Sequence, residues 1–574
     1  MAFVHAFRMR LVSARIEAGA TPGIGLLLVL FFIIQGIFFI RANAPTYDEA
    51  VHLAAGYSYL AEKDFRLDSE HPPLIKELQA LPLLLGYRLP FNPDRQHWQD
   101  KKGFLIGQDF LYESALPADH MLTLARPASL FLGGLLLVVV GWWAYRLWGR
   151  GGALLAMALA AFDPNLIAHS SLVTNDLGVS VFIFITFYLL WEYVNSPSLR
   201  LLAETGISAG IALVSKYSAL LLIPIAFIVA LLLVGSDRSL LLPFHRNPRE
   251  RRHKVLQAAA ALLIIVSISL LIIPPVYFFQ GFGIWLSGLQ LLLSITQDGR
   301  PSFLLGEYSY EGWWSYYLIA FLIKTPLGTL VLIVLSLALY KTGTRLTWRT
   351  VVFLLTPVII FFAVTTQSKV AVGLRYILPV YPFLIVLASR VATVHFRRHW
   401  FAPLLIGTPL VLTAISSLRI APHQLAYFNE FVGGPDQGYR YLSDSNVDWG
   451  QDLRGVKAYM EKENLPIIYL SYFGTAPPSY YGIRYQYVPG AWPLEWPPPA
   501  DKVPAGASRK ILAISVSSLQ DISTPYHPLF RWLWVRHPVA KIGYSIFLYD
   551  LTHDREGLAK LEETYGKAGV RLPP

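Results

Sequence analysis

The sequence of 574 residues contains no cysteine, which excludes disulfides, thiolate metal sites and cysteine nucleophiles. Charged residues are also scarce, at 15% of the chain, whereas a soluble domain usually carries about 25%. The sequence has no internal repeats, no low-complexity tract and no Gly-rich phosphate loop that ends in Gly-Lys-Ser or Gly-Lys-Thr. These absences argue against a soluble, disulfide-bonded or nucleotide-binding protein.

Hydrophobic residues make up 54% of the chain and fall in blocks of about 17–25 residues. As helices, such blocks are long enough to cross the roughly 30 Å hydrocarbon core of a bilayer. We therefore predict an α-helical polytopic membrane protein with about eleven transmembrane helices. The predicted spans are 23–41, 125–146, 151–168, 177–194, 201–215, 217–235, 256–279, 313–340, 350–366, 374–392 and 401–419.

The first apolar run resembles a signal peptide, because Arg8, Arg10 and Arg15 precede it and Ala42-Asn43-Ala44 follows it. The run is long for a signal peptide, however, and Pro45 disfavours cleavage after the alanine pattern. We therefore expect an uncleaved first span.

The formal net charge of +11 could indicate nucleic-acid binding, but the basic residues cluster in short loops between the apolar blocks. Every second loop is basic, which by the positive-inside rule places the N-terminus inside. The segment 42–124 and everything after about residue 420 are then outside. The basic residues of the predicted inside loops are Arg146, Arg150, Arg200, Arg246, Arg249, Arg251, Arg252, Lys254, Lys341, Arg345, Arg349, Arg390, Arg397 and Arg398.

The predicted first external loop, 42–124, should contain helices. Thr46-Tyr47-Asp48-Glu49 has the spacing of a capping box, so a helix should begin there and end near Ala61. A second helix should follow His71-Pro72-Pro73, because proline is tolerated in the first helical turn. Leucines recur in it at helical spacing, opposite Lys76, Glu77 and Gln79, so it should lie along the membrane surface as an amphipathic helix.

After about residue 420 prolines and tyrosines become more frequent, and short β-type runs appear at 467–470, 511–516 and 545–549. Asp448 is placed to cap a helix that runs from Trp449 to about Glu463. We predict two domains, a transmembrane domain at 1–419 and a small external soluble α/β domain at 420–574. Trp449, Trp492 and Trp496 could stack on sugars, pack this domain or lie at the membrane interface.

Two adjacent carboxylates, Asp48 and Glu49, follow the first span directly. Glu49 has a structural explanation, because it is the capping-box residue and favours the positive end of a helix dipole. Asp48 has no such assignment and suits a general base that acts on a hydroxyl group. His52 lies one helical turn further on the face of Asp48 and is a candidate for acceptor contact, as are Asp448 and Trp449.

Glu70-His71-Pro72-Pro73 can be a simple turn into a helix or a rigidly held site, in which His71 or Lys76 faces a phosphate. Arg126 begins the second predicted span, where a long basic side chain can also reach the interface without a function.

Lys216, Lys324 and Arg375 are harder to dismiss, because a cation within a span is costly unless it faces a partner or a cavity. Asp163 and Asp176 add carboxylates on the predicted outer side, where either could cap a helix. Taken alone, these residues fit an enzyme that acts on a phospholipid-linked substrate, or a transporter for an anionic solute.

Several segments together resemble the glycosyltransferase-C superfamily, in particular the protein O-mannosyltransferase and aminoarabinose transferase group with its bacterial phospholipid carrier-dependent glycosyltransferases. The resemblance rests first on Tyr47-Asp48-Glu49 after the first span and on Glu70-His71-Pro72-Pro73-Leu74. Later segments with the same resemblance are 305–309, 312–314, 324–326, 375–382 and 444–453.

The resemblance implies transfer of a sugar from a polyprenyl-phosphate donor to a glycolipid, polysaccharide or protein at the outer face of the bacterial cytoplasmic membrane. It implies Asp48 as the catalytic base, with Glu49 and Asp176 as further acidic site residues. It places Glu70, His71, Arg126, Lys216, Lys324 and Arg375 at the donor phosphate. No cofactor is then required, no metal site is expected, and a divalent ion at Glu70 and His71 is the less favoured variant.

The alternative from another class is a transporter or flippase for an anionic lipid-linked solute. Transporters tend to have inverted repeats and paired broken helices, which the sequence does not indicate. A long external loop with a capping box and a rigid Pro-Pro motif suits an enzyme better.

Overall fold

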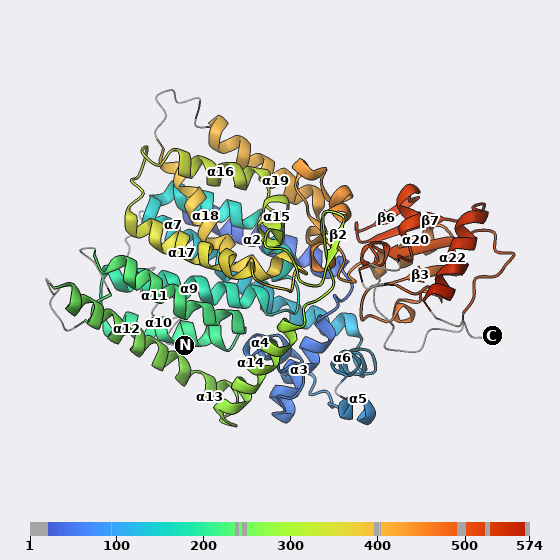
Figure 1. The fold of residues 1–574 in the computed structure, drawn as a ribbon, viewed down its shortest axis with the longest axis horizontal. Coiled ribbons are helices and arrows are strands. Elements are labelled where there is room, and N and C mark those ends of the chain that lie inside the picture. The colour runs from blue at the N-terminus through green and yellow to red at the C-terminus, as the bar shows by residue number, and fades with distance from the viewer. Residues whose placement is uncertain are drawn as a thin grey trace.

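The structure is a computed structural model that describes residues 21–568 except 93, 101, 236–239, 244–249, 395–400, 402, 491–500 and 523–527. Apolar helices form most of the molecule, and a C-terminal domain with a β-sheet lies at one end of them (Figure 1). The basic residues at 8–15, 246–249 and 397–398, and Trp492 and Trp496, lie outside the described residues.

Among the described residues, six helices are long and apolar enough to cross a membrane, or seven if one bent pair is a single span. The six are α2 (Thr21–Ala42), α7 (Ala118–Ala161), α9 (Asp176–Asn195), α12 with α13 (Arg251–Val276), α17 (Trp348–Thr365) and the stretch Leu374–Thr393 around α18 (Tyr381–Ser389). Further apolar segments are shorter: Tyr217–Leu233, which contains α11 (Leu222–Leu233), α14 (Phe282–Gln297), and Leu404–Ile420, which contains α19 (Thr408–Ile420). The predicted count of eleven spans is therefore not confirmed.

Two predicted spans, 125–146 and 151–168, lie mainly in one helix, α7, which kinks at Gly149. Gly149 has φ of 74°, a left-handed conformation that glycine adopts without steric cost. The short helix α8 (Pro164–Ser170) follows. The predicted span 201–215 is the fifteen-residue helix α10 (Leu199–Leu213), which is too short to cross the hydrocarbon core by itself.

The predicted continuous span 313–340 is broken. It consists of α15 (Tyr316–Lys324) and α16 (Leu327–Ala338), which are bent by 108° at Thr325-Pro326. Proline lacks the N–H that a continuing helix needs and disfavours helical backbone in the residue before it. Lys324 therefore lies at a helix end, and the described part of the chain contains one such broken helix pair.

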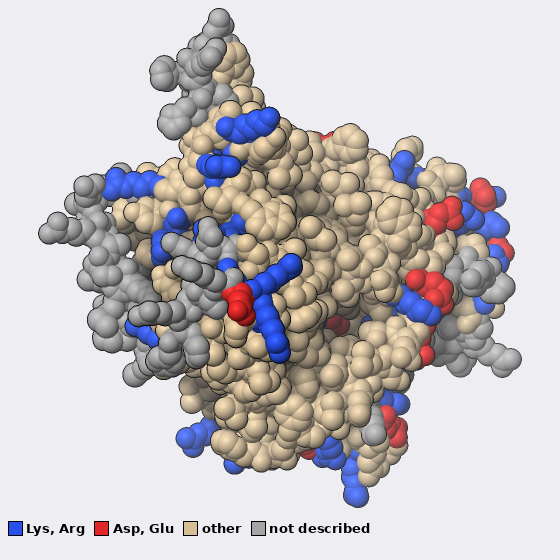
Figure 2. All heavy atoms as spheres, turned by 60° about the vertical axis from the view of Figure 1, so that its left-hand side comes forward, with Lys and Arg blue, Asp and Glu red and all other residues tan. Residues whose placement is uncertain are grey.

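Helix α9 lies at the centre of the helical part, because 94% of the residues in its most apolar stretch are buried, against 28% in that of α12. Leucine and phenylalanine side chains of α2 and α12 are exposed instead, among them Leu27, Phe38 and Leu271. Figure 2 shows a broad uncharged surface over the helices. Such a surface fits a lipid environment, and the chain is a polytopic helical membrane protein.

The segment 42–124 forms α3 (Glu49–Glu62), α4 (Leu74–Gly86), α5 (Arg95–Gln99) and α6 (Gly103–Tyr112), so both predicted helices are confirmed. The orientation of α4 was not foreseen: Lys76, Glu77 and Gln79 are buried, whereas leucines such as Leu81 and Leu85 are exposed. The polar residues have partners inside, as Gln79 donates to Ser129 Oγ at 2.7 Å and to the Thr174 carbonyl at 3.0 Å. The leucine side is thus free to contact the membrane surface.

The C-terminal domain contains a five-stranded sheet in the order β4-β3-β5-β7-β6. The strands β3 (Ile468–Ser471), β5 (Ile511–Ser515) and β7 (Ile546–Asp550) occupy the three predicted β-type runs. Strands β4 (Tyr485–Tyr487) and β5 pair with β3 in parallel, whereas β7 is antiparallel to β5 and to β6 (Ala540–Ile542). Helices α20 (Leu453–Lys462), α21 (Val516–Leu519) and α22 (Arg555–Lys567) complete the α/β fold, and a hairpin of β1 (Ser302–Leu304) and β2 (Glu307–Ser309) lies earlier in the chain.

Asp448 is not the predicted helix cap, because α20 begins only at Leu453. The buried Asp448 carboxylate instead accepts the backbone N–H of Ser517 at 2.9 Å and that of Gly450 at 3.3 Å. It therefore ties the segment before α20 to the sheet.

The segment 42–124 and the C-terminal domain lie at the same end of the helical part (Figure 1). Arg454 forms an ion pair with Asp119 at 2.6 Å, Tyr481 donates to Asp119 at 3.0 Å, and Thr475 donates to the Tyr47 carbonyl at 2.9 Å. These contacts agree with the predicted placement of both segments on one side of the membrane.

A pH effect on stability is expected from Glu77, whose burial raises the pKa of its carboxyl group from 4.5 to about 8. The folded protein thus holds a proton that the unfolded chain releases, so stability should fall as the pH rises from about 4.5 to 8. The slope is at most about 1.4 kcal/mol per pH unit. Unfolding of the wild type in detergent across this range, compared with Glu77→Gln, measures it.

The Glu77→Gln variant should lack this part of the pH dependence and be more stable than the wild type above neutral pH. The matched control is Glu62→Gln, because Glu62 is exposed at the end of α3. Equal pH dependence of Glu77→Gln and the wild type would show that Glu77 is ionised in the folded protein.

Candidate active site

Asp48 lies between α2 and α3, and its Oδ2 accepts a hydrogen bond from Nη1 of Arg375 at 2.8 Å. The same Nη1 is 3.9 Å from Oδ2 of Asp176, the first residue of α9. The other oxygen of Asp176 binds Nζ of Lys216, which follows α10. Four side chains from distant parts of the sequence thus alternate in sign, and we call Asp48, Arg375, Asp176 and Lys216 the charge chain.

Exposure differs along the charge chain and is largest at Asp48. The exposed fractions of the side chains are 20% for Asp48, 11% for Arg375, 13% for Lys216 and 3% for Asp176. Oδ1 of Asp48 makes no hydrogen bond to any residue that the structure describes. Asp48 therefore offers one free carboxylate oxygen at the accessible end of a buried ionic network.

Burial alone would raise the pKa of Asp48, because a charged carboxylate loses hydration. The charges of Arg375, His52 and His71 outweigh burial, so the pKa of Asp48 lies below its ordinary value of 3.8. Asp48 is then ionised at neutral pH and ready to accept a hydrogen bond or a proton.

A second cluster surrounds Asp68, in the turn before α4. Its carboxylate lies 2.7 Å from Nζ of Lys76, 3.0 Å from Nδ1 of His71 and 3.6 Å from Nε2 of His52. Burial opposes ionisation of Asp68, but Lys76, His71 and His52 together hold its pKa well below the ordinary value. The predicted site residues His52 and His71 are thus brought together by an aspartate that the motifs did not indicate.

The structure gives one signal for Asp68, a backbone φ of 51°, which is uncommon for a residue other than glycine. The sequence motifs do not indicate Asp68, because its partners Lys76, His71 and His52 are brought to it only in the folded chain.

The residues that could hold a metal ion are His52, Asp68 and His71, whose ligand atoms all lie within 4.8 Å of one another. Nδ1 of His52 contacts the Val173 carbonyl at 3.0 Å, which turns Nε2 toward Asp68 as in many histidine ligands. However, the Lys76 ammonium already neutralises Asp68 and also donates to the carbonyl of His71 at 2.9 Å. Glu70, which shared the less favoured metal site with His71, is not part of this cluster.

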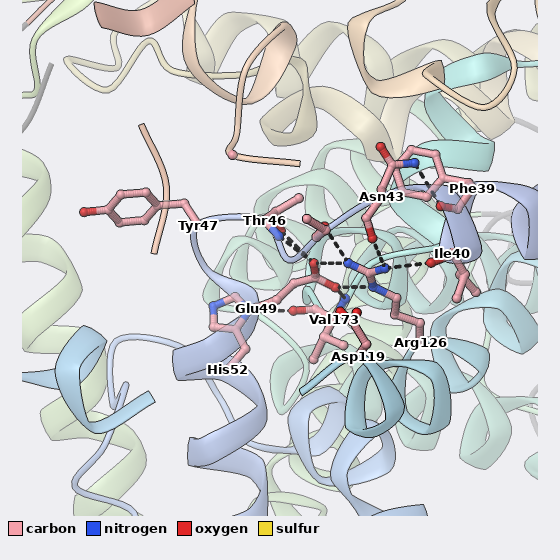
Figure 3. A network of polar contacts seen from close by, with 12 residues as sticks. Phe39, Ile40, Asn43, Thr46, Tyr47, Glu49, His52, Asp119, Arg126 and Val173 are labelled. Carbon is pink, nitrogen blue, oxygen red and sulfur yellow. Dashed lines mark hydrogen bonds and ion pairs between the residues drawn. The ribbon is translucent and has the colours of Figure 1, made fainter. Parts of the chain in front are cut away.

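Glu49 and Arg126 form a buried pair next to the charge chain (Figure 3). Arg126 donates twice to the Glu49 carboxylate, at 2.8 and 2.7 Å. Its three remaining N–H groups reach the carbonyls of Ile40, Asn43 and Ala44 at 3.0–3.1 Å. Because all five donors of Arg126 are used and the side chain is only 1% exposed, it has no group left for a donor phosphate.

The carboxylate of Glu49 also accepts the N–H groups of Thr46 and Val173, both at 2.8 Å. The first of these is the predicted capping-box contact. In the structure Glu49 and Arg126 thus bind each other and the backbone, which is a structural role; the catalytic role of Glu49 and the donor-binding role of Arg126 stay predictions. They join the end of α2 to α3, α7 and the residues before α9.

Lys324, also predicted at the donor phosphate, is bound by backbone carbonyls in the structure. Its Nζ donates to the carbonyls of Leu425, at 2.9 Å, and Asn446, and the side chain is 2% exposed. These bonds attach the C-terminal segment to the break between α15 and α16. Asp163 caps α8 by accepting the N–H groups of Asn165 and Leu166 at 2.9 and 3.0 Å, as one of its two interpretations predicted.

Trp449 is not placed to stack on a sugar, because it is 2% exposed and packs against Phe39, Leu172 and Phe473. Asp448 is buried, and Nδ1 of His52 is taken by the Val173 carbonyl. These three residues therefore have interior positions, and their contact with an acceptor or sugar stays a prediction. Glu70 lies beside the Asp68 cluster, where burial and the charge of Asp68 raise its pKa.

Comparison with solved structures finds ArnT from Cupriavidus metallidurans in the apo state, at 13% identity and a TM-score of 0.49. The similarity covers 93% of this chain and 98% of ArnT. ArnT bound to undecaprenyl phosphate gives 12% identity, the same TM-score of 0.49 and the same coverage of 93% and 98%. The oligosaccharyltransferase AglB from Archaeoglobus fulgidus, in complex with an inhibitory peptide and a dolichol-phosphate, gives 12% identity and a TM-score of 0.43, over 77% of this chain and 58% of AglB.

A search of curated proteins gives no match. Residues 24–282 match the family model described as dolichyl-phosphate-mannose-protein mannosyltransferase. The matched segment contains α2, α3, α4 and α9 and three of the four residues of the charge chain. The predicted resemblance is thus confirmed: this membrane protein is similar, over residues 24–282, to the dolichyl-phosphate-mannose-protein mannosyltransferase family, which indicates a glycosyltransferase.

Proposed function

We propose that this protein transfers a sugar from a polyprenyl-phosphate donor to an acceptor at the outer face of the membrane, with Asp48 as the general base. The observation that carries the proposal is the charge chain, in which the accessible carboxylate of Asp48 pairs with Arg375 and Asp176 lies between Arg375 and Lys216. The family match at residues 24–282 supports the reaction class. The acceptor is a glycolipid, a polysaccharide or a protein.

In the proposed reaction an acceptor hydroxyl attacks the anomeric carbon of the donor. The bond from this carbon to the phosphate oxygen breaks, and the polyprenyl phosphate leaves with the bonding electron pair and one additional negative charge. Oδ1 of Asp48 accepts the proton of the hydroxyl. A single displacement of this kind inverts the anomeric centre, and no cofactor enters the scheme.

The groups proposed to bind the leaving phosphate are the cations Lys216 and Arg375 and the imidazole of His71. They remain from the larger predicted set because the side chains of His71, Lys216 and Arg375 are 26%, 13% and 11% exposed, whereas Arg126 and Lys324 are only 1% and 2% exposed. Cations at this place stabilise the negative charge that develops on the phosphate as the glycosidic bond breaks.

Lys216→Met is expected to lower kcat/KM for the donor by about tenfold to a hundredfold, the usual value of a hydrogen bond to a charged group. Initial rates at several donor concentrations measure the change. Lys63→Met is the matched control, because Lys63 is exposed at the end of α3. An unchanged kcat/KM in Lys216→Met would remove Lys216 from the proposed donor site.

The donor and acceptor classes can be identified with radiolabelled polyprenyl-phosphate mannose, glucose and aminoarabinose, added to membranes that contain the protein. Label that moves into a lipid, glycan or protein fraction supports the transferase and names both substrates. Carrier-linked sugar that crosses the bilayer without being consumed would instead establish the transporter, and the proposed transferase would then be wrong.

A further inference from the structure

The segment Asn446-Val447-Asp448-Trp449-Gly450-Gln451 connects the C-terminal domain with the residues that precede Asp48. The N–H of Tyr47 donates to the Trp449 carbonyl at 2.8 Å, and the N–H of Ala44 donates to the Gln451 carbonyl at 2.8 Å. These two bonds hold the backbone just before Asp48 against residues more than four hundred positions later in the sequence.

The Trp449 ring lies against the other partner of the ion pair. The centre of the Arg375 guanidinium is 4.3 Å from the centre of the ring, and both side chains are largely withdrawn from water. Within the described residues, Nε of Arg375 is buried and has no hydrogen-bond partner. The guanidinium is therefore oriented by Asp48 at one edge and by an aromatic face, a contact that strengthens when water is absent.

Trp449 is itself held firmly. The backbone N–H of Trp449 donates to Oε1 of Gln451 at 2.8 Å, and Nε2 of Gln451 donates to the Val447 carbonyl at 2.9 Å. The neighbouring Asp448 binds the N–H of Ser517 at 2.9 Å, at the end of β5. Gly450 allows the turn, because its φ is 91° and a Cβ atom there would meet the Tyr472 hydroxyl at 2.8 Å.

We propose that Trp449 is a positioning residue for the transfer reaction: its ring fixes the Arg375 guanidinium against Asp48, so the C-terminal domain completes the site formed by the membrane helices. The inference rests on the proposed role of Asp48. It gives the 444–453 segment a role in the reaction in addition to its role in packing.

The test compares Trp449→Met, which keeps an apolar side chain without a ring face, with Trp449→Phe, which keeps an aromatic face. We expect Trp449→Met to lower kcat on the order of tenfold or more, with a smaller change in donor KM. The acidic limb of its pH–rate profile should also shift to higher pH, because a loosely held Arg375 lowers the pKa of Asp48 less. Trp449→Phe should restore most of the rate and of the profile.

Trp348→Met is the matched control, because Trp348 is 57% exposed at the start of α17 and lies in none of the motif segments, so it should be replaceable without effect. Unfolding in detergent determines the folded fraction of each variant, to which rates are normalised. If Trp449→Met does not fold, Gln451→Ala takes its place, because it removes the acceptor of the Trp449 backbone N–H. The acidic limb of its pH–rate profile should shift in the same direction.

A folded Trp449→Met with the wild-type pH–rate profile would overturn the inference, and so would a Trp449→Phe as impaired as Trp449→Met. Either result would leave Trp449 as a packing residue. The proposed function is tested separately by Asp48→Asn, because wild-type turnover by that variant would disprove Asp48 as the base whatever Trp449 does.

Discussion

Replacing Asp48 with Asn is expected to lower kcat for sugar transfer by about 10²–10⁴, the usual contribution of a positioned general base. Asn keeps the size of the side chain and one oxygen but has no basic carboxylate. Because Asp48 is partly exposed and, among the described residues, forms its ion pair with Arg375, its loss should change the chemical step more than the fold. Initial rates with a saturating labelled donor measure kcat.

Donor binding is the internal control for this prediction, since the phosphate is proposed to contact cations and not Asp48. The dissociation constant for the donor should therefore change little in Asp48→Asn. Asp64→Asn is a matched substitution outside the site, because Asp64 pairs only with the exposed Arg66 among the described residues. Wild-type turnover by Asp48→Asn would disprove Asp48 as the base.

The second large effect concerns stability and not chemistry. Arg126→Ala should lower the free energy of unfolding by about 3–5 kcal/mol, because it leaves the buried charge of Glu49 without its partner. It would also leave the carbonyls of Ile40, Asn43 and Ala44 without the hydrogen bonds that Arg126 provides. Unfolding in detergent, followed by denaturant or heat, measures the loss.

Arg66→Ala is the matched control, because the side chain of Arg66 is 73% exposed and its pair with Asp64 should be worth at most about 1 kcal/mol. A variant that replaces both Glu49 and Arg126 by uncharged residues of similar size should be less damaged than Arg126→Ala, since no charge is then left unpaired. If Arg126→Ala were stable but failed to bind the donor, the role predicted from the sequence would be restored.

The two predictions separate neighbouring acidic residues that look alike in the sequence. Asp48 and Glu49 are adjacent carboxylates at a helix start, yet one ends the charge chain and the other is enclosed by Arg126, Thr46 and Val173. The expected loss is thus in turnover for Asp48 and in folding for the Glu49–Arg126 pair.

Features that depend on residues close together in the chain could be predicted from the sequence. The long apolar blocks predicted membrane helices, and several form them. The capping-box spacing predicted the start of α3, and the β-type runs at 467–470, 511–516 and 545–549 form β3, β5 and β7. These features follow from side-chain periodicity and backbone preferences, which act over one or two turns of chain. The resemblance to a family rested on motifs of the same short range.

The pairing of polar residues, by contrast, could be read only from the folded structure. Arg126 was predicted at a phosphate but pairs with Glu49, Lys324 lies at a break between helices, and Lys76 faces the interior with Asp68. A buried charge must find a partner, and that partner is chosen by contacts between residues far apart in the chain. Arg375 meets Asp48 across 327 positions, so local sequence could name both residues as candidates but could not join them.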